Sequence, residues 1–420
     1  MAGMLVAHRA VEFEQELAAG CCTYDEPREV ACFSRAADRS VRYNDRSQLR
    51  TFVRPELNSD LNTGFEAFVD KAAGAPIDDI VDALADGKAD TTAAHFVTYR
   101  NNLNKLLYTP YSPRDEWQIG VSRHGRTIHL HCIETEAHAE RERSRSEQER
   151  RKQYWGYAFE AAATMSAAAR SSARAVSRPS DPAASATDGA AVNSNAEFCS
   201  IAQTKLGGNR IIFAAEVDCE KTRGFGEKGG GPHAMRNYVE LKTSKLLLSS
   251  DEAGRRTLER FKMSKWWLQS FLLGITSIVC GFRDEAGVLR KMQDFEVKQL
   301  PKFVHGAWKP AVMLNFGSAA LGWLYERVIS GPPTARYVLA YEPAQRRLAL
   351  RIAPEGVLPS PRPPPAAAAA APASAEEAAA AVAAARQRGK AAQAVAGGKR
   401  GRQETLPPKA RPPARRIVDE

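Results

Sequence analysis

The segment IIFAAEVDC, residues 211–219, is apolar until it presents two acids, Glu216 and Asp218. Its isoleucines, phenylalanine and valine favour a buried strand. Successive side chains of a strand point to opposite faces, so the two carboxylates are expected on one face while Val217 points to the other. Two neighbouring carboxylates on a buried strand form a candidate cation site.

A second segment, YVELKT at residues 238–243, places Glu240 and Lys242 on one strand face. Hard cations such as Mg²⁺ bind oxygen ligands, and two of them about 4 Å apart can hold both the attacking water and the leaving oxygen of a phosphodiester. A lysine beside them can offset charge that develops on the phosphorus oxygens. Either motif alone is more often a solvated strand face. Together they resemble the core of nucleases of the PD-(D/E)XK type.

The surrounding sequence alternates strand and helix patterns, which predicts a single mixed α/β domain with sheets flanked by helices. Residues 117–133 and 198–218 each have the pattern of a hairpin with glycine at its turn, and residues 277–283 that of a further strand. The longest apolar run, residues 266–282, is interrupted by polar residues and glycines, so we expect a buried helix and strand there and no membrane span. The predicted helices are residues 61–70, 96–107, 134–164, 251–273 with Ser250 or Asp251 as N-cap, and 311–329.

Two segments contain too few large apolar residues to form a core. Residues 165–195 are mostly Ala, Ser, Pro and Arg, which predicts a disordered insertion. Residues 357–420 are rich in Ala and Pro and carry 11 basic against 5 acidic residues, so they supply +6 of the net charge of +10. We therefore predict a catalytic domain over residues 1–356 and a disordered basic tail over residues 357–420.

The composition excludes several classes of protein. A chain of 420 residues that is 44% hydrophobic and 26% charged can bury a large core, so collagen-like and wholly disordered proteins are excluded. The net charge of +10 favours a polyanionic partner, with nucleic acid as the first candidate. The seven cysteines form no CxxC pair and no signal-peptide pattern is present, so we expect an intracellular protein with reduced thiols.

Six blocks follow one another along the chain: FVTYRNNLNKLL, YWGYAFE, EFCSIAQTKLGG, AAEVDC, YVELKTSK and KWWLQSFLLGI. In this order and at these separations they resemble the DXO family of RNA 5′-end decapping exoribonucleases. The resemblance extends from about Pro27 to the helix after Trp308 and so covers most of the chain outside the tail. Six ordered blocks are far more specific than any one short motif.

The resemblance implies a role for each matching residue. In such enzymes the acids of the motifs bind divalent ions, Mg²⁺ or Mn²⁺, in a two-metal site. The implied metal ligands, which are also catalytic, are Glu160, Glu216, Asp218 and Glu240. Lys242 and Gln269 would lie around the attacking water and the scissile phosphate, with Lys242 catalytic as well. Arg100 would bind a substrate phosphate near the reacting centre.

Several of these residues can also be judged without the family. Glu160 lies among aromatic residues and alanines, where a carboxylate is costly unless it is paired or metal-bound. Gln269 lies in an apolar helix and needs a partner if it is buried. Arg100 lies in a segment rich in Asn and Lys, so without the family a surface arginine stays a credible interpretation. A possible zinc site is formed by His129, His131 and His138 near Glu134 and Glu136, but His-x-His on a strand is more often a solvated face, and no cysteine pair completes the site.

The function that the resemblance implies is a metal-dependent hydrolase of RNA 5′ ends. It would remove incomplete or non-standard caps, unmethylated or of the NAD type, with 5′-triphosphate pyrophosphohydrolase and 5′-3′ exoribonuclease as further activities. One alternative is a non-catalytic RNA-binding subunit that stabilises a partner exonuclease of the XRN type, although four intact acids argue against it. Another is a DNA nuclease with the same core. The basic clusters of the tail predict the nucleus, alone or together with the cytoplasm, and no membrane is expected.

Overall fold

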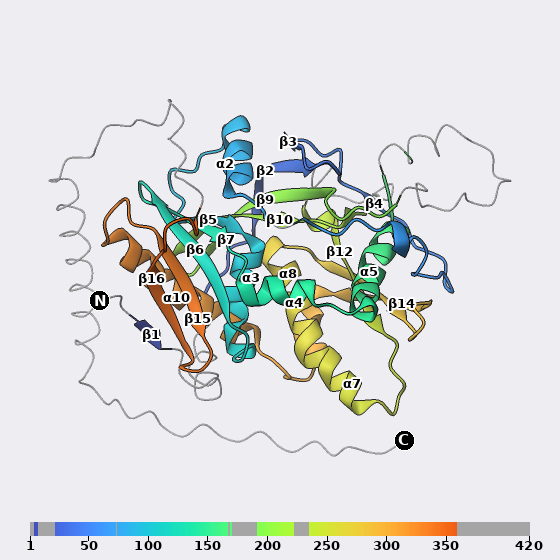
Figure 1. Ribbon diagram of the computed structural model, residues 1–420. Coiled ribbons are helices and arrows are strands. Elements are labelled where there is room, and N and C mark those ends of the chain that lie inside the picture. Colours follow the sequence, from blue (N-terminus) through green and yellow to red (C-terminus); the bar gives the residue numbers. More distant parts are fainter. Residues whose placement is uncertain are drawn as a thin grey trace, which may run out of the picture. The chain divides into compact units, whose positions relative to one another are not determined.

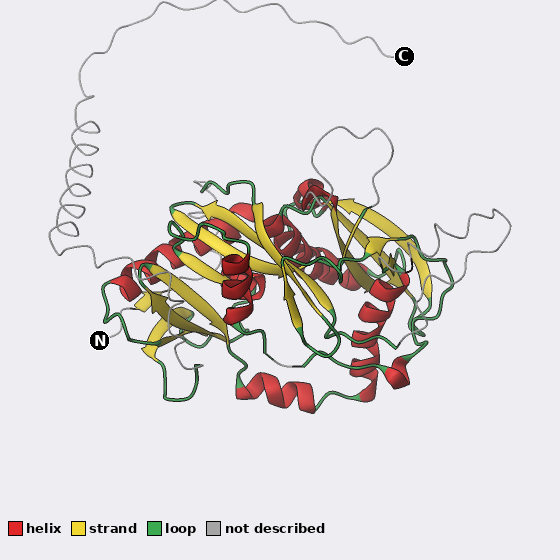
Figure 2. Ribbon diagram, turned by 90° about the horizontal axis from the view of Figure 1, so that it is seen from above, coloured by secondary structure: helices red, strands yellow, loops and turns green. Residues whose placement is uncertain are grey.

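The computed structural model of the protein describes residues 4–6, 22–72, 74–166, 169, 191–221 and 235–358. The chain divides into two units, Met1–Pro359 and Ser360–Glu420, and all of these residues belong to the first. This first unit is built from two β-sheets with helices packed on their faces (Figures 1 and 2). The predicted mixed α/β class is confirmed.

The larger sheet contains both predicted hairpins. Over the described residues it has ten strands in the order β1-β16-β15-β6-β7-β5-β10-β9-β2-β3. Strand β6 pairs antiparallel with β7 and β9 pairs antiparallel with β10, while β5 joins the two hairpins by pairing parallel to β7 and β10. The bounds are β1 Met4–Val6, β2 Arg28–Arg35, β3 Val41–Tyr43, β5 Phe96–Tyr99, β6 Trp117–His124, β7 Thr127–Cys132, β9 Glu197–Leu206, β10 Asn209–Glu216, β15 Tyr337–Glu342 and β16 Arg347–Ile352.

The smaller sheet contains the other two predicted strands. Its order is β14-β13-β12-β11-β4-β8, and β12 lies inside it, parallel to β13 and antiparallel to β11. The bounds are β4 Thr51–Phe52, β8 Thr164–Met165, β11 Cys219–Glu220, β12 Tyr238–Lys245, β13 Ser277–Arg283 and β14 Leu289–Glu296. Because β10 belongs to the large sheet and β11 to the small one, the chain crosses between the sheets directly after Glu216.

Helices cover the faces of both sheets, and helix α8 lies between the large sheet and the small sheet (Figure 1). Helix α2 packs on one face of the large sheet, α3 and α10 pack on the other, and α8 contacts both α3 and β13. Helix α5 covers the opposite face of the small sheet, where it packs on β12. The bounds are α2 Ile77–Asp86, α3 Arg100–Tyr108, α4 Glu136–Arg143, α5 Glu147–Ala162, α7 Glu252–Thr257, α8 Met263–Leu273, α9 Leu300–Phe303 and α10 Pro310–Ile329. Short 3-10 turns are Phe65–Ala67, Thr109–Tyr111, Met235–Asn237 and Val297–Gln299.

The predicted helix at residues 96–107 is wrong in its first part. Its first four residues form strand β5, all of them buried, and the helix begins only at Arg100. The β-branched and aromatic residues of FVTY are held by parallel pairing on both sides, which local helical periodicity does not reveal. This correction matters for the site because Arg100 becomes the first residue of a helix that follows a central strand.

Two other predicted helices are interrupted or absent. Residues 61–70 contain only a 3-10 turn, because Asp60 accepts a hydrogen bond from the backbone N–H of Asn62 at 2.9 Å and holds the chain in a turn. Residues 134–164 form two helices, since Ser146 caps a new helix by a capping box with Glu149.

The predicted cap Asp251 is confirmed, although residues 251–273 include a π-helical turn at Leu258–Lys262. Helix α10 agrees with its prediction to one residue. No helix in the described part of the chain is long and apolar enough to cross a bilayer.

Both predicted segment boundaries differ from the packing that is seen. At the end of the predicted insertion, Ser194 and Asn195 are 7% and 6% exposed, and Asn195 accepts a hydrogen bond from the backbone N–H of Ala72 at 2.9 Å. At the other boundary Leu358 is 5% exposed, so the core extends two residues past the predicted end at residue 356. Residues 170–190 and the tail from residue 359 onward lie outside the described residues.

Candidate active site

The crossover between the two sheets brings the predicted acids together. Strand β10 ends at Glu216 and β11 begins at Cys219, so Asp218 lies between the two strands. The prediction that Glu216 and Asp218 share one face of a single strand is therefore wrong. Strand β11 pairs with β12, and the backbone N–H of Leu241 donates to Asp218 Oδ2 at 2.6 Å. Asp218 therefore reaches the site by bridging to the neighbouring strand, beside Glu240.

Glu240 is the most completely paired acid of the site. It is 2% exposed, and its two oxygens face Lys242 Nζ at 2.5 Å and Arg100 Nη1 at 3.5 Å. Burial alone would raise the pKa of Glu240, but Lys242 and Arg100 outweigh burial and hold the pKa below its ordinary value. The predicted E-x-K pair is thus a desolvated ion pair with Lys242 fixed beside the acids.

Glu160 and Asp218 are the two acids without such compensation. Burial and the neighbouring Glu240 raise the pKa of Asp218 to about 7. Burial and then Asp218 raise the pKa of Glu160 well above its usual range. Within the described part of the chain neither carboxylate has an ion-pair partner. This is the electrostatic condition that a bound cation would relieve.

Arg100 is a buried residue that contacts three other elements of the fold. It is 7% exposed, and besides its contact with Glu240 it donates to the backbone carbonyls of Gln269 at 3.2 Å and Glu216 at 3.0 Å. The interpretation as a surface arginine is therefore wrong. Its predicted contact with a substrate phosphate stays a prediction.

Gln269 lies on α8 beside this arginine and is half-buried. Its carbonyl is what Arg100 contacts, while its side-chain amide has no hydrogen-bond partner among the residues that the structure describes. An amide left open at the edge of the acid cluster can contact a substrate oxygen or a water. The structure brings Gln269 to the site, as predicted, and leaves its role open.

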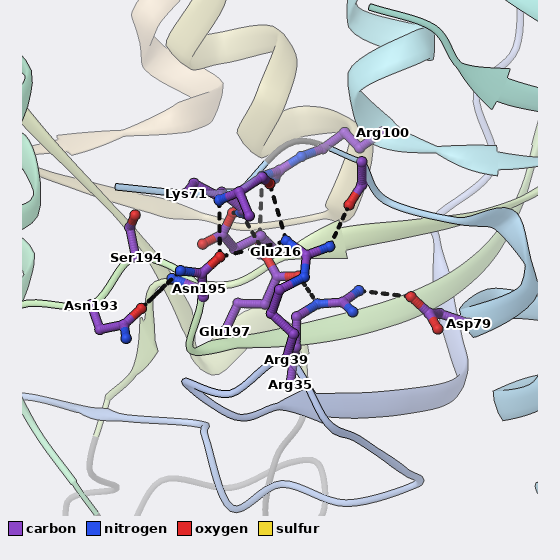
Figure 3. Close-up of polar contacts among 12 residues, drawn as sticks. Arg35, Arg39, Lys71, Asp79, Arg100, Asn193, Ser194, Asn195, Glu197 and Glu216 are labelled. Atoms are coloured by element: carbon purple, nitrogen blue, oxygen red, sulfur yellow. Dashed lines mark hydrogen bonds and ion pairs between the residues drawn. The ribbon is translucent and has the colours of Figure 1, made fainter. Parts of the chain in front are cut away.

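Sequence reasoning missed two residues of the site. Lys71 Nζ lies 2.8 Å from Glu216 Oε2 and 2.6 Å from Glu197 Oε2 (Figure 3). Tyr157, three residues before Glu160 on α5, has a pKa raised to about 12 by burial and by the charges of Glu216 and Glu160. Helical spacing within YWGYAFE could have indicated Tyr157. No local pattern marks Lys71, because long-range contacts place it.

The donor set fits a hard divalent cation. Four carboxylates supply the oxygen ligands that Mg²⁺ and Mn²⁺ prefer, and two of them are short of positive charge. In the described residues no three His, Cys, Asp or Glu side chains are gathered so that they could hold an ion. Glu216 and Glu240 instead face the ammonium groups of Lys71 and Lys242, and Asp218 accepts a hydrogen bond from a backbone N–H.

Two histidines of the β6–β7 hairpin, His129 and His131, are buried. His129 and His131 are 9% and 8% exposed, so the predicted solvated strand face is wrong. Burial lowers the pKa of His129 to about 3 and that of His131 to about 4. His131 Nε2 lies 2.8 Å from the Ser122 hydroxyl, and His129 stacks on His124 at 4.2 Å. These neutral rings serve packing.

Comparisons with known proteins show what the sequence and the fold of this chain are similar to. The sequence profile of the family described as RAI1-like PD-(D/E)XK nuclease matches residues 25–361. The human decapping and exoribonuclease protein is 29% identical over 337 residues, 76% of this chain and 80% of that protein. The crystal structure of Schizosaccharomyces pombe Rai1 with 3′-FADP superposes with a TM-score of 0.64 at 28% identity, covering 84% of this chain and all of that one. Candida albicans Rai1, crystallised with pU5 and Mn²⁺, shares the fold at 21% identity, with a TM-score of 0.68 over 84% of this chain and 93% of that one.

Proposed function

The chain belongs to the RAI1-like PD-(D/E)XK nuclease family, and on this premise we propose that it is a metal-dependent hydrolase of RNA 5′ ends. Its substrates are RNAs with incomplete or non-standard caps, of the unmethylated guanosine or NAD type. Pyrophosphate removal from 5′-triphosphates and 5′-3′ exonuclease cleavage belong to the same proposal. The name of the human relative supports cap removal and exonuclease cleavage, and the complex of Rai1 with 3′-FADP supports a dinucleotide cap.

One observation carries the proposal. Two half-buried acids, Glu160 and Asp218, have no ion-pair partner among the described residues and lie beside a third acid that is paired with Lys242. An arrangement that serves stability alone would pair these charges or replace them with apolar groups. A divalent cation balances them and, once bound, activates water and polarises a phosphoryl oxygen. A non-catalytic RNA-binding subunit has no use for the unpaired acids.

Each residue of the site has a proposed task. The metal ligands are the four acids of the crossover, β12 and α5: Glu160, Glu216, Asp218 and Glu240. Lys242, held by Glu240, stabilises negative charge on the reacting phosphate. Gln269 contacts the water or the phosphate through its open amide. The main task that we assign to Arg100 is to order Glu240 and the crossover, because Arg100 is buried against them. Contact with the substrate phosphate is its second proposed task.

The finer points are also proposals. Mg²⁺ or Mn²⁺ in a two-metal arrangement suits an all-oxygen donor set, and the Mn²⁺ in the Candida albicans complex supports Mn²⁺. Basic clusters in the tail support a nuclear location. We also propose an assembly with a partner exonuclease of the XRN type, to which the 5′-end hydrolase would supply RNAs with 5′-monophosphate ends.

The test is to incubate the purified chain with 5′-labelled RNAs that end in triphosphate, unmethylated cap, methylated cap or NAD. Each reaction contains Mg²⁺, Mn²⁺ or EDTA, and a 5′-phosphorylated single-stranded DNA separates the rival DNA nuclease. We expect release of the unmethylated and NAD ends with metal and none with EDTA. Cleavage of the DNA alone, or of no substrate with either metal, would refute the proposal.

A further inference from the structure

A chain of alternating charges runs from helix α2 to the acid cluster (Figure 3). Asp79 pairs with Arg35 Nη2 at 2.8 Å, and Arg35 Nε donates to Glu197 Oε1 at 2.8 Å. The other oxygen of Glu197 accepts from Lys71 Nζ at 2.6 Å, and the same Nζ reaches Glu216 Oε2 at 2.8 Å. The chain therefore ends on an acid of the candidate metal site.

The members of this ion-pair chain near α2 are buried, and the two members next to the candidate metal site are more exposed. The side chains of Asp79, Arg35 and Glu197 are 11%, 6% and 7% exposed, whereas those of Lys71 and Glu216 are 39% and 41% exposed. Buried, charge-assisted hydrogen bonds fix the geometry of the inner members. Lys71 thus rests on a fixed acid and holds a more exposed one.

The backbone around Lys71 is held as well. Val69 N–H donates to the carbonyl of Val192 at 3.0 Å, and Ser194 N–H donates to the carbonyl of Val69 at 3.0 Å. On the other side, Ala72 N–H donates to the side chain of Asn195 at 2.9 Å. Residues 69–72 are therefore fastened to the segment that leads into β9, where Glu197 begins the strand.

Only one oxygen of Glu216 is engaged by this contact. Lys71 holds Oε2, and among the described residues Oε1 accepts no hydrogen bond. At the same residue Arg100 donates to the backbone carbonyl at 3.0 Å, so the main chain is fixed too. A metal-ligating carboxylate that is held through one oxygen presents the other in a defined direction.

We propose that Lys71 is a positioning residue that orients Glu216 for the divalent cation, with Glu197 and Arg35 fixing Lys71 in turn. The inference rests on the proposed metal-dependent function and names a residue that its motifs do not contain. It acts through Glu216 and touches neither the metal nor the RNA.

Replacing Lys71 distinguishes a positioning role from two other roles, charge neutralisation and RNA contact, by the change in metal affinity and in the KM for RNA. Its positive charge repels a cation, so a lysine that merely neutralises Glu216 would, when removed, let the metal bind more tightly. A lysine that positions Glu216 would, when removed, leave the metal bound more weakly. A lysine that contacts RNA would change the KM for RNA and leave metal affinity as it was.

The experiment titrates Mn²⁺ into the full chain by calorimetry, without RNA, for wild type and the variants Lys71→Met, Lys71→Gln and Lys71→Arg. Lys245→Met is the matched control, because Lys245 pairs with Glu285 in a surface ion pair whose side chains are 46% and 71% exposed. RNA hydrolysis is then followed at saturating Mn²⁺ to obtain kcat and KM separately. Thermal unfolding of each variant reports whether it is folded.

We expect Lys71→Met and Lys71→Gln to bind Mn²⁺ about 10- to 100-fold more weakly, as for other residues that orient metal ligands. Lys71→Arg should restore most of the affinity, Lys245→Met should match wild type, and KM for RNA should not change. Tighter or unchanged Mn²⁺ binding in the two uncharged variants would overturn the inference, as would a raised KM with normal Mn²⁺ affinity. Because the titration needs no RNA, failure of wild type to cleave RNA would instead count against the proposed function.

Discussion

Glu197 and Asp218 are two acids that lie close to the same crossover and are treated in opposite ways. Glu197 faces Lys71 at 2.6 Å and Arg35 at 2.8 Å, and these cations outweigh burial and hold its pKa below the ordinary value. Among the described residues Asp218 accepts a hydrogen bond only from the backbone N–H of Leu241, while burial and Glu240 raise its pKa to about 7. The two carboxylates are therefore shifted in opposite directions: the pKa of Glu197 is lowered and that of Asp218 is raised.

The difference separates acids that support the fold from acids that serve a ligand. A buried carboxylate with two cations is a closed unit, whose loss should harm stability. A desolvated carboxylate beside other carboxylates costs stability, and a fold retains it when a cation or substrate uses that charge. By this reasoning Glu197 belongs to the scaffold, and Asp218 with Glu160 to the chemistry.

The largest effect is expected on the functional side. The double variant Glu216→Ala/Asp218→Ala should lose hydrolysis of every RNA substrate while the protein stays folded, because it removes two metal ligands and their mutual repulsion. Gel analysis of product and circular dichroism check the two halves of this prediction. Asp294→Ala, which breaks an exposed pair with Arg54, is the control and should keep full activity. Full activity in the folded double variant would end the assignment of the site.

A smaller loss is expected for the lysine of the E-x-K pair. Lys242→Ala should lower kcat about 100-fold and change the KM for RNA little, since a fixed ammonium stabilises charge that develops during reaction. Steady-state kinetics at saturating metal give both constants. If only KM rose, Lys242 would bind the phosphate in the ground state and would not stabilise the transition state.

The scaffold side of the comparison is tested by stability. Glu197→Gln should lower the free energy of unfolding by about 3–5 kcal/mol, because it leaves buried Arg35 without one of its two acids. Urea unfolding measures this change. A loss near zero would mean that Asp79 alone compensates Arg35 and that the paired acid is not a scaffold element.

Asp218, in contrast to Glu197, should lower the stability of the fold, and the size of this effect should depend on pH. Its pKa in the folded protein, about 7, lies above the ordinary 3.8, so folded protein holds a proton there that unfolded protein has lost. Ionised Asp218 therefore costs stability that is absent below pH 4, grows as pH rises to about 7 and is constant above it. Without metal, Asp218→Asn should accordingly be more stable than wild type at pH 8, and this advantage should vanish near pH 4. Equal stability at both pH values would show that Asp218 is not strained.

The sequence predicted the parts of the site that depend on local period. Alternation along YVELKT gave Glu240 and Lys242 their shared face, and the hairpin before Glu216 was placed with its turn. The same alternation misplaced Asp218, because the chain leaves the large sheet after Glu216 and joins another. Strand pairing, not periodicity, decides where a sheet ends.

Other differences have the same origin. FVTY before Arg100 became a strand because partners on both sides pair with it. Lys71 could not be foreseen, since the bridge between Val69 and Asn193 that brings it to Glu197 joins residues more than 100 positions apart. Long-range contacts of this kind leave no trace in a local pattern.

Proton release on metal binding tests the central claim, that the unpaired acids are kept for a cation. Mn²⁺ is titrated into the full chain by calorimetry at pH 6 and pH 9, each in two buffers that differ in ionisation enthalpy. Because Asp218 has a pKa of about 7 and that of Glu160 is also raised, binding at pH 6 should release roughly one proton or more, and less at pH 9. The release should fall in Asp218→Asn. Mn²⁺ binding without proton release at pH 6, or equal binding by Glu216→Ala/Asp218→Ala, would contradict the claim.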